Sequence, residues 1–253
     1  MKTTSGVLLF LSLFGLNSGL FRRHYYVSNK MYWENAQTYC RNNYDDLSTA
    51  SGPDLKTLSK VSDLHRYFYW IGLQSDTSRH IWRWSNGGKA KINDWARGEP
   101  RIYYEKCGCV YTGDSKVRDA DCFWNIPFFC MNVYELVLVK QESTWEEALD
   151  YCRQNYLDLA ILYSDVVMTE AKNNSTNAQT DELWTGLRFL SGRWLWVNGE
   201  ELQYTHWSGG QDLHCPAMNQ RCGVYHRQEM AWKTEDCEKK LNFLCVKKAY
   251  SLP

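Results

Sequence analysis

The sequence lacks the features that usually identify an enzyme or a nucleic-acid-binding protein. Its 253 residues contain 29 basic and 29 acidic side chains, so the formal net charge is zero, and there is no general attraction to nucleic acid or to an anionic membrane. No glycine-rich phosphate loop, nucleophile elbow or carboxylate pair occurs, and the six histidines show no metal-ligand spacing. We therefore expect a binding module that is not an enzyme and has no nucleic-acid partner.

Long hydrophobic runs are also missing, apart from a short one at the start. The chain begins with Met1-Lys2, residues 7–14 are apolar, and small residues follow at 17–19. This run is shorter than the ~20 residues of a membrane-spanning helix, although a membrane anchor is the alternative. Residues 1–19 are therefore expected to form a cleaved signal peptide, which predicts a secreted, extracellular protein without membrane insertion.

The rest of the chain carries the same landmarks twice, in the same order. Each copy has Trp-Glu, aromatic-Cys-Arg, Trp-x-Gly-Leu and Trp-x-Trp-x-Asn-Gly segments, then three cysteines with spacings of 15 and 8 residues. The copies run from Trp33 to Cys130 and from Trp145 to Cys245, and each has the length of a small domain of ~100–150 residues. The expected organisation is a signal peptide at 1–19, a first domain at 20–132, a second domain at 133–248 and a tail at 249–253.

Within each copy, the pattern of apolar residues predicts two helices followed by short strands. Ser143 is expected to cap the helix that places Trp145, Ala148 and Cys152 on one face. Two helices, small antiparallel sheets and a long loop in each copy define an α+β fold. The other expected elements are helices at 54–64 and 164–172, strands at 68–73, 81–84, 109–111, 183–187, 193–197 and 222–225, and long loops at 93–106 and 204–221. The repeated tryptophans expected in the core are Trp70, Trp82, Trp184 and Trp194.

Ten cysteines in an exported chain indicate disulfides. Cys109 and Cys215 have no counterpart in the other copy. We expect a bridge between these two, and the alternative is a bridge to another chain, which would give a disulfide-linked oligomer. The remaining pairs are expected to follow the repeat, as Cys40–Cys130, Cys107–Cys122, Cys152–Cys245 and Cys222–Cys237.

This ordered set of landmarks resembles the C-type lectin-like domain, present twice and covering most of the chain. The family includes mannose-receptor-like proteins and secreted lectins, so the resemblance implies a module that binds a glycan or a glycoprotein. It also implies a site in the long loop. There the family holds Ca²⁺ with a Glu-Pro-Asn or Gln-Pro-Asp triplet, an isolated Glu and a Trp-Asn-Asp triplet, and the ion contacts sugar hydroxyls.

The first copy retains only part of this calcium site. Arginine replaces both asparagines of the family pattern, and its guanidinium has no acceptor oxygen, whereas Ca²⁺ takes six to eight oxygens. We expect the arginines to pair with the remaining carboxylates in place of a metal, so that calcium is possible in the first domain only and no cofactor is required. The candidate ligand-binding residues are Glu99, Pro100, Arg101, Glu105, Arg118 and Asp119.

The second copy has lost more of the pattern. Gln211-Asp212-Leu213 stands at the first triplet, Gln220 at the isolated Glu, and Trp232-Lys233-Thr234 at the last triplet. No calcium is expected there.

Two overlapping glycosylation sequons begin at Asn173 and Asn174, and they predict an exposed loop. The complete reading is a secreted lectin-like protein that recognises carbohydrate with degenerate calcium sites. The alternative is a calcium-independent protein–protein interaction module without sugar binding. An ice-binding role would need a flat, threonine-rich face, which the sequence does not show.

Overall fold

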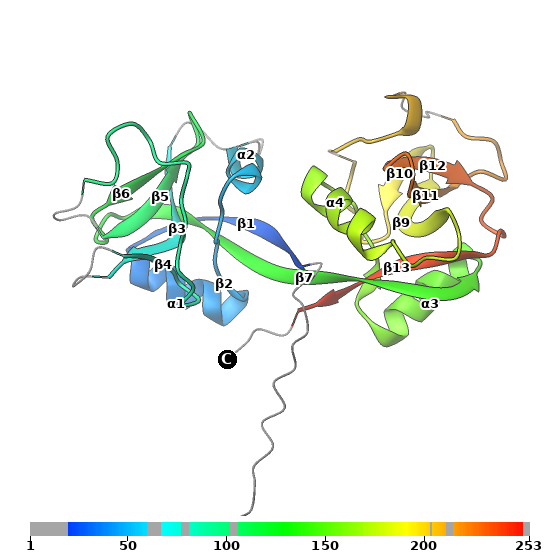
Figure 1. Cartoon of the computed structure of the whole chain (residues 1–253), viewed down its shortest axis with the longest axis horizontal. Helices are drawn as coiled ribbons and strands as arrows, with labels where there is room; N and C mark the ends of the chain where they lie inside the picture. Colours follow the sequence, from blue (N-terminus) through cyan, green and yellow to red (C-terminus); the bar gives the residue numbers. More distant parts are fainter. Residues whose placement is uncertain are drawn as a thin grey trace, which may run out of the picture.

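The structure is a computed structural model that describes residues 20–59, 67–76, 81–101, 106–202, 204–210 and 215–249. Two lobes are connected by one long strand, β7 (Ile126–Ser143) (Figure 1). Each lobe contains two helices and a set of strands, in agreement with the α+β prediction. The expected signal peptide lies outside the described residues.

The elements follow the order expected from the repeat. The first lobe contains β1 (Leu20–Met31), α1 (Trp33–Asn43), β2 (Asp46–Leu47), α2 (Pro53–Ser59), β3 (Phe68–Ser75), β4 (Trp82–Trp84), β5 (Cys107–Tyr111) and β6 (Lys116–Ala120). The second contains α3 (Trp145–Asn155), β8 (Asp158–Leu159), α4 (Asp165–Asn174), β9 (Glu182–Leu190), β10 (Arg193–Trp196), the short 3₁₀ turn η1 (Ser208–Gly210), β11 (Cys222–His226), β12 (Ala231–Glu235) and β13 (Leu241–Lys248). None of the helices in the described part of the chain has the length and apolar character needed to span a bilayer.

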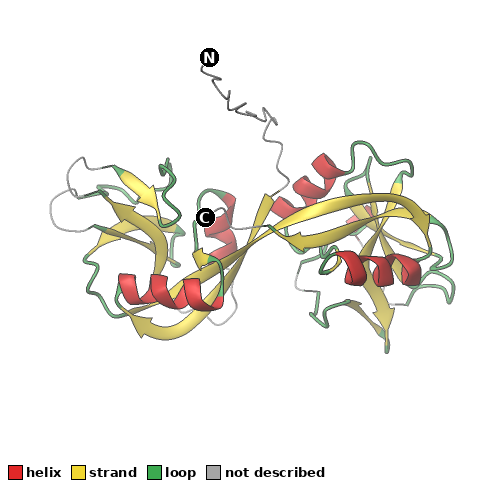
Figure 2. Cartoon of the chain, turned by 90° about the horizontal axis from the view of Figure 1, so that it is seen from below, coloured by secondary structure: helices red, strands yellow, loops and turns green. Residues whose placement is uncertain are grey.

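Strand β7 belongs to both lobes. Its first part pairs antiparallel with β1, with Tyr25 opposite Cys130, and its second part pairs with β13, with Cys245 opposite Val137. The small sheets predicted for each copy are therefore joined into one 13-stranded sheet, and long strands pass from one lobe to the other (Figure 2). The domain limit expected between residues 132 and 133 falls inside β7, so the backbone crosses between the lobes as a hydrogen-bonded strand.

Strand β1 begins the first lobe but contributes to the core of the second. Phe21 is only 3% exposed and packs in one apolar cluster with Leu136, Leu162 and Leu244. Its ring stacks on Tyr134 with a centroid distance of 5.7 Å. The junction between the lobes is therefore partly made of core packing.

Charged side chains also bridge the two lobes. Lys248 Nζ lies 2.8 Å from Asp45 Oδ1, and Arg23 forms an ion pair with Glu200. The Arg23 guanidinium also lies over the Tyr163 ring, 5.3 Å from its centroid. Partly exposed ion pairs of this kind contribute about 1 kcal/mol or less each, so they orient the lobes more than they stabilise them.

Helix α3 starts one residue later than the sequence suggested. Its cap is Thr144, whose hydroxyl accepts a hydrogen bond from Glu147 N while the Glu147 carboxylate accepts one from Thr144 N. The prediction of Ser143 as the cap is wrong because Ser143 ends β7, where its carbonyl accepts the Trp184 indole N–H at 2.8 Å. The predicted apolar face is confirmed, with buried Trp145, Ala148 and Cys152.

Helix α4 is longer than predicted and ends with the asparagines of both glycosylation sequons, and Ser175 and Thr176 follow in a turn. Asn173 and Asn174 lie in its last turn, so the expectation of an exposed loop is wrong. Asn173 is exposed, whereas Asn174 is half-buried and its side chain donates to the Glu170 carbonyl at 2.9 Å. In the first lobe, residues 60–64 of the expected second helix lie outside the described residues.

The four disulfides predicted from the repeat are confirmed. The bonded pairs are Cys40–Cys130, Cys107–Cys122, Cys152–Cys245 and Cys222–Cys237. The expected bridge between Cys109 and Cys215 is not formed. Cys109 lies fully buried in the core of the first lobe, whereas Cys215 is exposed on the second. A disulfide needs Cα atoms roughly 4–7 Å apart, and these two positions belong to different lobes.

The tryptophans expected in the core fall into two groups. Trp70 and Trp184 are fully buried, which confirms the prediction for them. Trp82 and Trp194 are only half-buried. Each of these packs at a centroid distance of 5.0 Å against a further repeated indole, in the pairs Trp82–Trp95 and Trp194–Trp207.

The position of Phe21 predicts that a change in β1 weakens the second lobe. Replacing Phe21 by Ala removes a buried ring and should lower the free energy of unfolding by about 3–5 kcal/mol. Urea unfolding followed by tryptophan fluorescence measures the change. Leu20→Ala, at a 40% exposed neighbour, is the control and should change stability by about 0.5 kcal/mol or less. Equal stability of the two variants would contradict the shared core.

Candidate functional site

Beside the long loop of the first lobe, Arg101 contacts two of the three carboxylates expected to form the site, Glu99 in the loop and Asp119 on β6. Its guanidinium lies 3.0 Å from Glu99 Oε1, and its backbone N–H donates to Asp119 Oδ2 at 2.7 Å. The side chain of Glu99 is 5% exposed and Asp119 is 4% exposed. Pro100 lies between the paired residues. Glu105, the third expected carboxylate, lies outside the described residues.

Arg118 does not point into this group, contrary to expectation. It pairs with Asp114, with Nη2 2.6 Å from Oδ2, and its guanidinium lies 5.1 Å from the centroid of the Tyr111 ring. The flanking side chains Val117 and Asp119 are buried, and alternate residues of a strand face opposite sides. Arg118 is therefore directed to the other face of β6, and its hydrogen bonds hold the pKa of Asp114 below the usual value.

The second lobe repeats this ion pair at the same positions. Lys233 stands four residues before Cys237, as Arg118 does before Cys122, and its Nζ lies 2.5 Å from Glu229 Oε1. Hydrogen bonds from Lys233 and then Ser208 lower the pKa of Glu229. Arg118 and Lys233 stand where the family pattern has an asparagine ligand. Each forms an ion pair with a carboxylate four residues earlier in the chain.

The described residues of the first-lobe loop do not fit a calcium ion. Ca²⁺ takes six to eight oxygen ligands, but Glu99 and Asp119 already accept contacts from Arg101. Even with Asp119 Oδ1, which is buried without a hydrogen-bond partner in the described part of the chain, the described side chains offer far fewer than six oxygens. Among the described residues, no group of three or more His, Cys, Asp or Glu side chains is placed to hold a metal.

A concave site lies in the long loop of the second lobe. A cavity of about 450 Å³ opens between η1 and the turn that joins β11 to β12. Ser208 Oγ donates to Glu229 Oε2 at 2.5 Å across this cavity wall. Its lining is formed by Thr205, His206, Trp207, Ser208, Gly209, Gly210, Glu229 and Ala231.

Contacts with Tyr204 and Trp232 hold His206 in the wall of this cavity. His206 stacks on Tyr204 with an interplanar angle of 11°, and the Tyr204 hydroxyl donates to Asp165 Oδ1 at 2.7 Å. His206 also accepts Trp232 N through its carbonyl at 2.8 Å. Sequence reasoning did not select this site; the only signal was Trp207, the third tryptophan of the repeated series.

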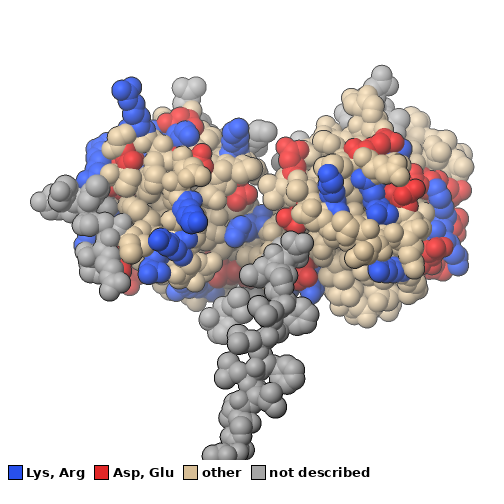
Figure 3. All heavy atoms as spheres, viewed as in Figure 1, with Lys and Arg blue, Asp and Glu red and all other residues tan. Residues whose placement is uncertain are grey.

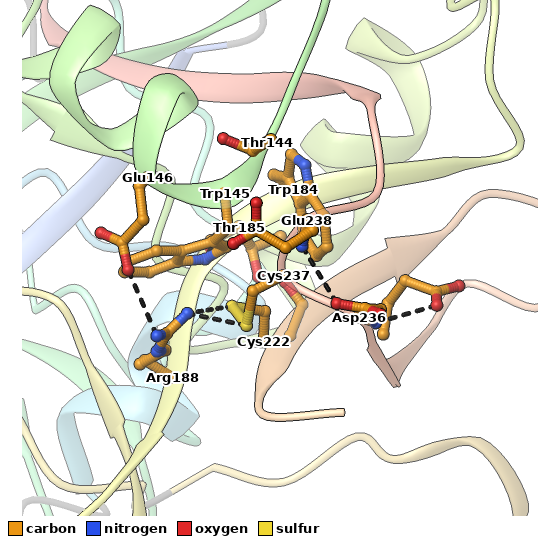
Figure 4. The surroundings of a disulfide bond; sticks show 12 residues. Thr144, Trp145, Glu146, Trp184, Thr185, Arg188, Cys222, Asp236, Cys237 and Glu238 are labelled. Atoms are coloured by element: carbon orange, nitrogen blue, oxygen red, sulfur yellow. Dashed lines mark hydrogen bonds and ion pairs between the residues drawn. A yellow bond between two sulfur atoms is a disulfide. The ribbon is translucent and has the colours of Figure 1, made fainter. Parts of the chain in front are cut away.

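A further cation in the second lobe has a structural role. The Arg188 guanidinium lies 4.6 Å from the Trp145 ring centroid, 3.2 Å from Glu146 Oε1 and 2.8 Å from Cys237 Sγ (Figure 4). Arg188 therefore connects the first residues of α3 with the Cys222–Cys237 disulfide through these contacts. The equivalent position of the first lobe, four residues after Trp70, is Gln74, so this contact is specific to the second.

The comparison with known families agrees with these landmarks. The model of the lectin C-type domain matches residues 29–132 and 141–247. The chain belongs to the lectin C-type domain family. Its two lobes are tandem domains of this family, which consists of ligand-binding modules rather than enzymes.

Relatives of the chain are large receptors. It is 27% identical to lymphocyte antigen 75 of Mesocricetus auratus over 85% of this chain and 14% of the relative. It is 22% identical to human C-type mannose receptor 2, over 76% of this chain and 15% of that protein. It is 23% identical to the human secretory phospholipase A2 receptor, over 72% and 15%. The chain thus spans about one seventh of the length of the relatives that it matches.

Solved structures of smaller proteins are similar to slightly less than half of this chain. Human lithostathine is 22% identical and covers 46% of this chain and 92% of its own, with a TM-score of 0.41. The carbohydrate-recognition domain of the mouse scavenger receptor C-type lectin is 20% identical and covers 47% and 92%, also with a TM-score of 0.41.

The ion pairs at the loop predict the response to calcium. We expect the melting temperature of the wild-type protein to be the same in millimolar CaCl₂ and in EGTA, because Arg101 holds the carboxylates. In Arg101→Asn, an amide oxygen replaces the guanidinium beside Glu99 and Asp119, and calcium should raise the melting temperature through binding to the native state. Differential scanning calorimetry measures both. A calcium-dependent rise in the wild type, lost in Asp119→Asn, would overturn this expectation.

Proposed function

We propose that this chain is a secreted lectin that recognises carbohydrate without calcium. The observation that carries the proposal is the cavity of about 450 Å³ in the second lobe. Its volume lies within the ~300–1,000 Å³ of small-ligand sites. Its wall offers hydroxyl, imidazole and carboxylate groups, and sugar hydroxyls, like those of Ser and Thr, both donate and accept hydrogen bonds.

Glu229 is the central acceptor of the proposed site. The hydrogen bonds from Lys233 and then Ser208 lower the pKa of Glu229, which favours its ionised form. An ionised carboxylate forms stronger hydrogen bonds than a neutral amide. Because Glu229 is held by two side chains of the lobe itself, it needs no metal ion to fix its position. Specificity in this proposal comes from direct hydrogen bonds.

The first lobe would supply a second, weaker contact. The Arg101 side chain is 70% exposed, so its remaining N–H groups are available to a ligand. Glu99, Pro100, Glu105 and Asp119 would shape this loop, whereas Arg118 is turned toward Asp114 and would not reach the same ligand.

Secretion is part of the proposal. It rests on the leader-like residues 1–19 and on the four disulfides, which form in oxidising compartments. Protein recognition without sugar binding is the second candidate, and the exposed aromatic side chains of the first lobe favour it.

A glycan array probed in millimolar Ca²⁺ and again in EGTA tests the proposed function. We expect the same glycans to bind in both conditions. Glu229→Gln keeps the shape but removes the charge, and should weaken binding by about 10-fold because a charge-assisted hydrogen bond is lost. Glu238→Gln, an exposed carboxylate outside the cavity lining, is the matched control. Binding that EGTA abolishes would overturn the metal-free site, and absence of binding in both conditions would overturn the lectin assignment.

A further inference from the structure

The first lobe exposes several large aromatic side chains. Phe123 is 77% exposed, Tyr32 47%, Trp124 40% and Tyr67 38%. Contiguous apolar surface of this kind usually marks an interaction site. We name this surface the aromatic face and define it as Tyr32, Tyr67, Phe68, Tyr111, Phe123 and Trp124.

Ring contacts join these side chains into two groups, which the consecutive residues Phe123 and Trp124 connect along the chain. Phe68 is at the centre, with centroid distances of 4.9 Å to Tyr111, 5.9 Å to Trp124 and 6.5 Å to Tyr67. Phe123, the residue before Trp124, packs against Tyr32 with a centroid distance of 5.9 Å. These rings come from the end of β1, from β3, from β5 and from the loop after β6, so tertiary packing brings them together.

The second lobe shows that the fold does not require these aromatic residues. Phe68 pairs with Tyr111 across β3 and β5, and Glu182 pairs with His226 at the same place across β9 and β11. Lys239 stands where the first lobe has Trp124, and it forms an ion pair with Glu182 at 2.9 Å. The complete set of second-lobe equivalents is Thr144, Asp181, Glu182, His226, Glu238 and Lys239.

The charges around the aromatic face have both signs. Arg118 lies 6.0 Å from the Phe68 centroid, but Asp114 balances its charge. Lys30 lies 5.5 Å from the Tyr67 centroid and forms no ion pair with a carboxylate of the described residues. Asp121 is exposed at the opposite edge and accepts Phe123 N at 3.0 Å. A surface with a cation at one edge and an anion at the other can complement itself.

The charge of the whole molecule places no barrier against self-association. The formal net charge is zero, and basic and acidic side chains are interspersed over both lobes in the view of Figure 3. Proteins near zero net charge have little long-range repulsion between copies. Interfaces of homodimers are also more apolar than other surfaces, and aromatic residues and Arg are enriched in them.

We propose that the aromatic face binds the same face of a second copy of this chain in a symmetric dimer. In such an isologous contact, the same surface of both copies takes part. The exposed rings of Phe123 and Trp124 become buried, and Lys30 of one copy meets Asp121 of the other. Only the first lobe carries this surface, so association closes at two copies and leaves the second lobe free. This inference is independent of the proposed carbohydrate site.

Sedimentation velocity of the full secreted chain, from about 1 to about 100 µM, tests the proposal. The background is Cys215→Ser, which prevents a covalent dimer through the exposed thiol. We expect the fraction of dimer to rise with concentration. Phe123→Glu/Trp124→Lys introduces the residues that the second lobe has at these positions, and should weaken dimerisation at least about 100-fold because a few buried aromatic residues dominate interface energy.

Two further variants separate the contact from a folding defect. Glu238→Ala/Lys239→Ala changes the equivalent surface of the second lobe and should leave dimerisation unchanged. Lys30→Glu should weaken the dimer, and Lys30→Glu/Asp121→Lys should restore it, which a structural role would not explain. A chain that is monomeric at the highest concentration, or a dimer that Phe123→Glu/Trp124→Lys does not change, would overturn the proposal. Binding of a glycan or another protein to this face of a monomer would overturn it as well.

Discussion

The continuous hydrogen bonding of β7 is the constraint on which the rest of the structure depends. Backbone N–H and C=O groups of a strand need hydrogen-bond partners, and β7 finds them in β1, β2 and β3 along its first part and in β13 along its second. Because β1 runs beside β7 across the junction, Phe21 reaches the core of the second lobe. Disulfides then attach the packing helices to this framework, through Cys130 on β7 and Cys245 on β13. Two domains of one family thus behave as a single structural unit at their junction.

Comparison of the two lobes separates what the fold needs from what each surface has gained. The buried indoles make the same bonds in both: Trp33 and Trp145 donate to the carbonyls of Ile71 and Thr185 at 2.9 Å. The surfaces next to Cys122 and Cys237 differ: the first lobe exposes aromatic rings there, whereas the second lobe has ion pairs. Residues that must be buried are constrained by packing density, whereas exposed positions are constrained only by what they bind.

In the long loops, ion pairs stand in the positions of metal ligands. A calcium site stabilises converging carboxylates only while the ion is bound, because the carboxylates repel one another without it. Arg101 in the first lobe and Lys233 in the second supply positive charge covalently, close to Glu99 and Glu229 respectively. We therefore expect the geometry of these loops not to depend on the calcium concentration, and a ligand would lack the directional coordination that a metal ion offers.

The sequence by itself determined the duplication, the two helices of each copy, the four disulfides and the family, because each rests on residue types at fixed spacings along the chain. It also showed arginine at both positions of the first copy where the family pattern has an asparagine ligand. It did not show that Arg118 turns to Asp114, since that depends on which face of β6 is buried. The prediction of a Cys109–Cys215 bridge was wrong for a similar reason. Cys109 is buried because β5 packs into the core of the first lobe, and the number of cysteines does not reveal this. The aromatic face, the cavity beside Trp207 and the continuous strand β7 were decided only by the tertiary structure. Each depends on contacts between segments far apart in the chain, and spacing along a sequence carries no information about which distant surfaces meet.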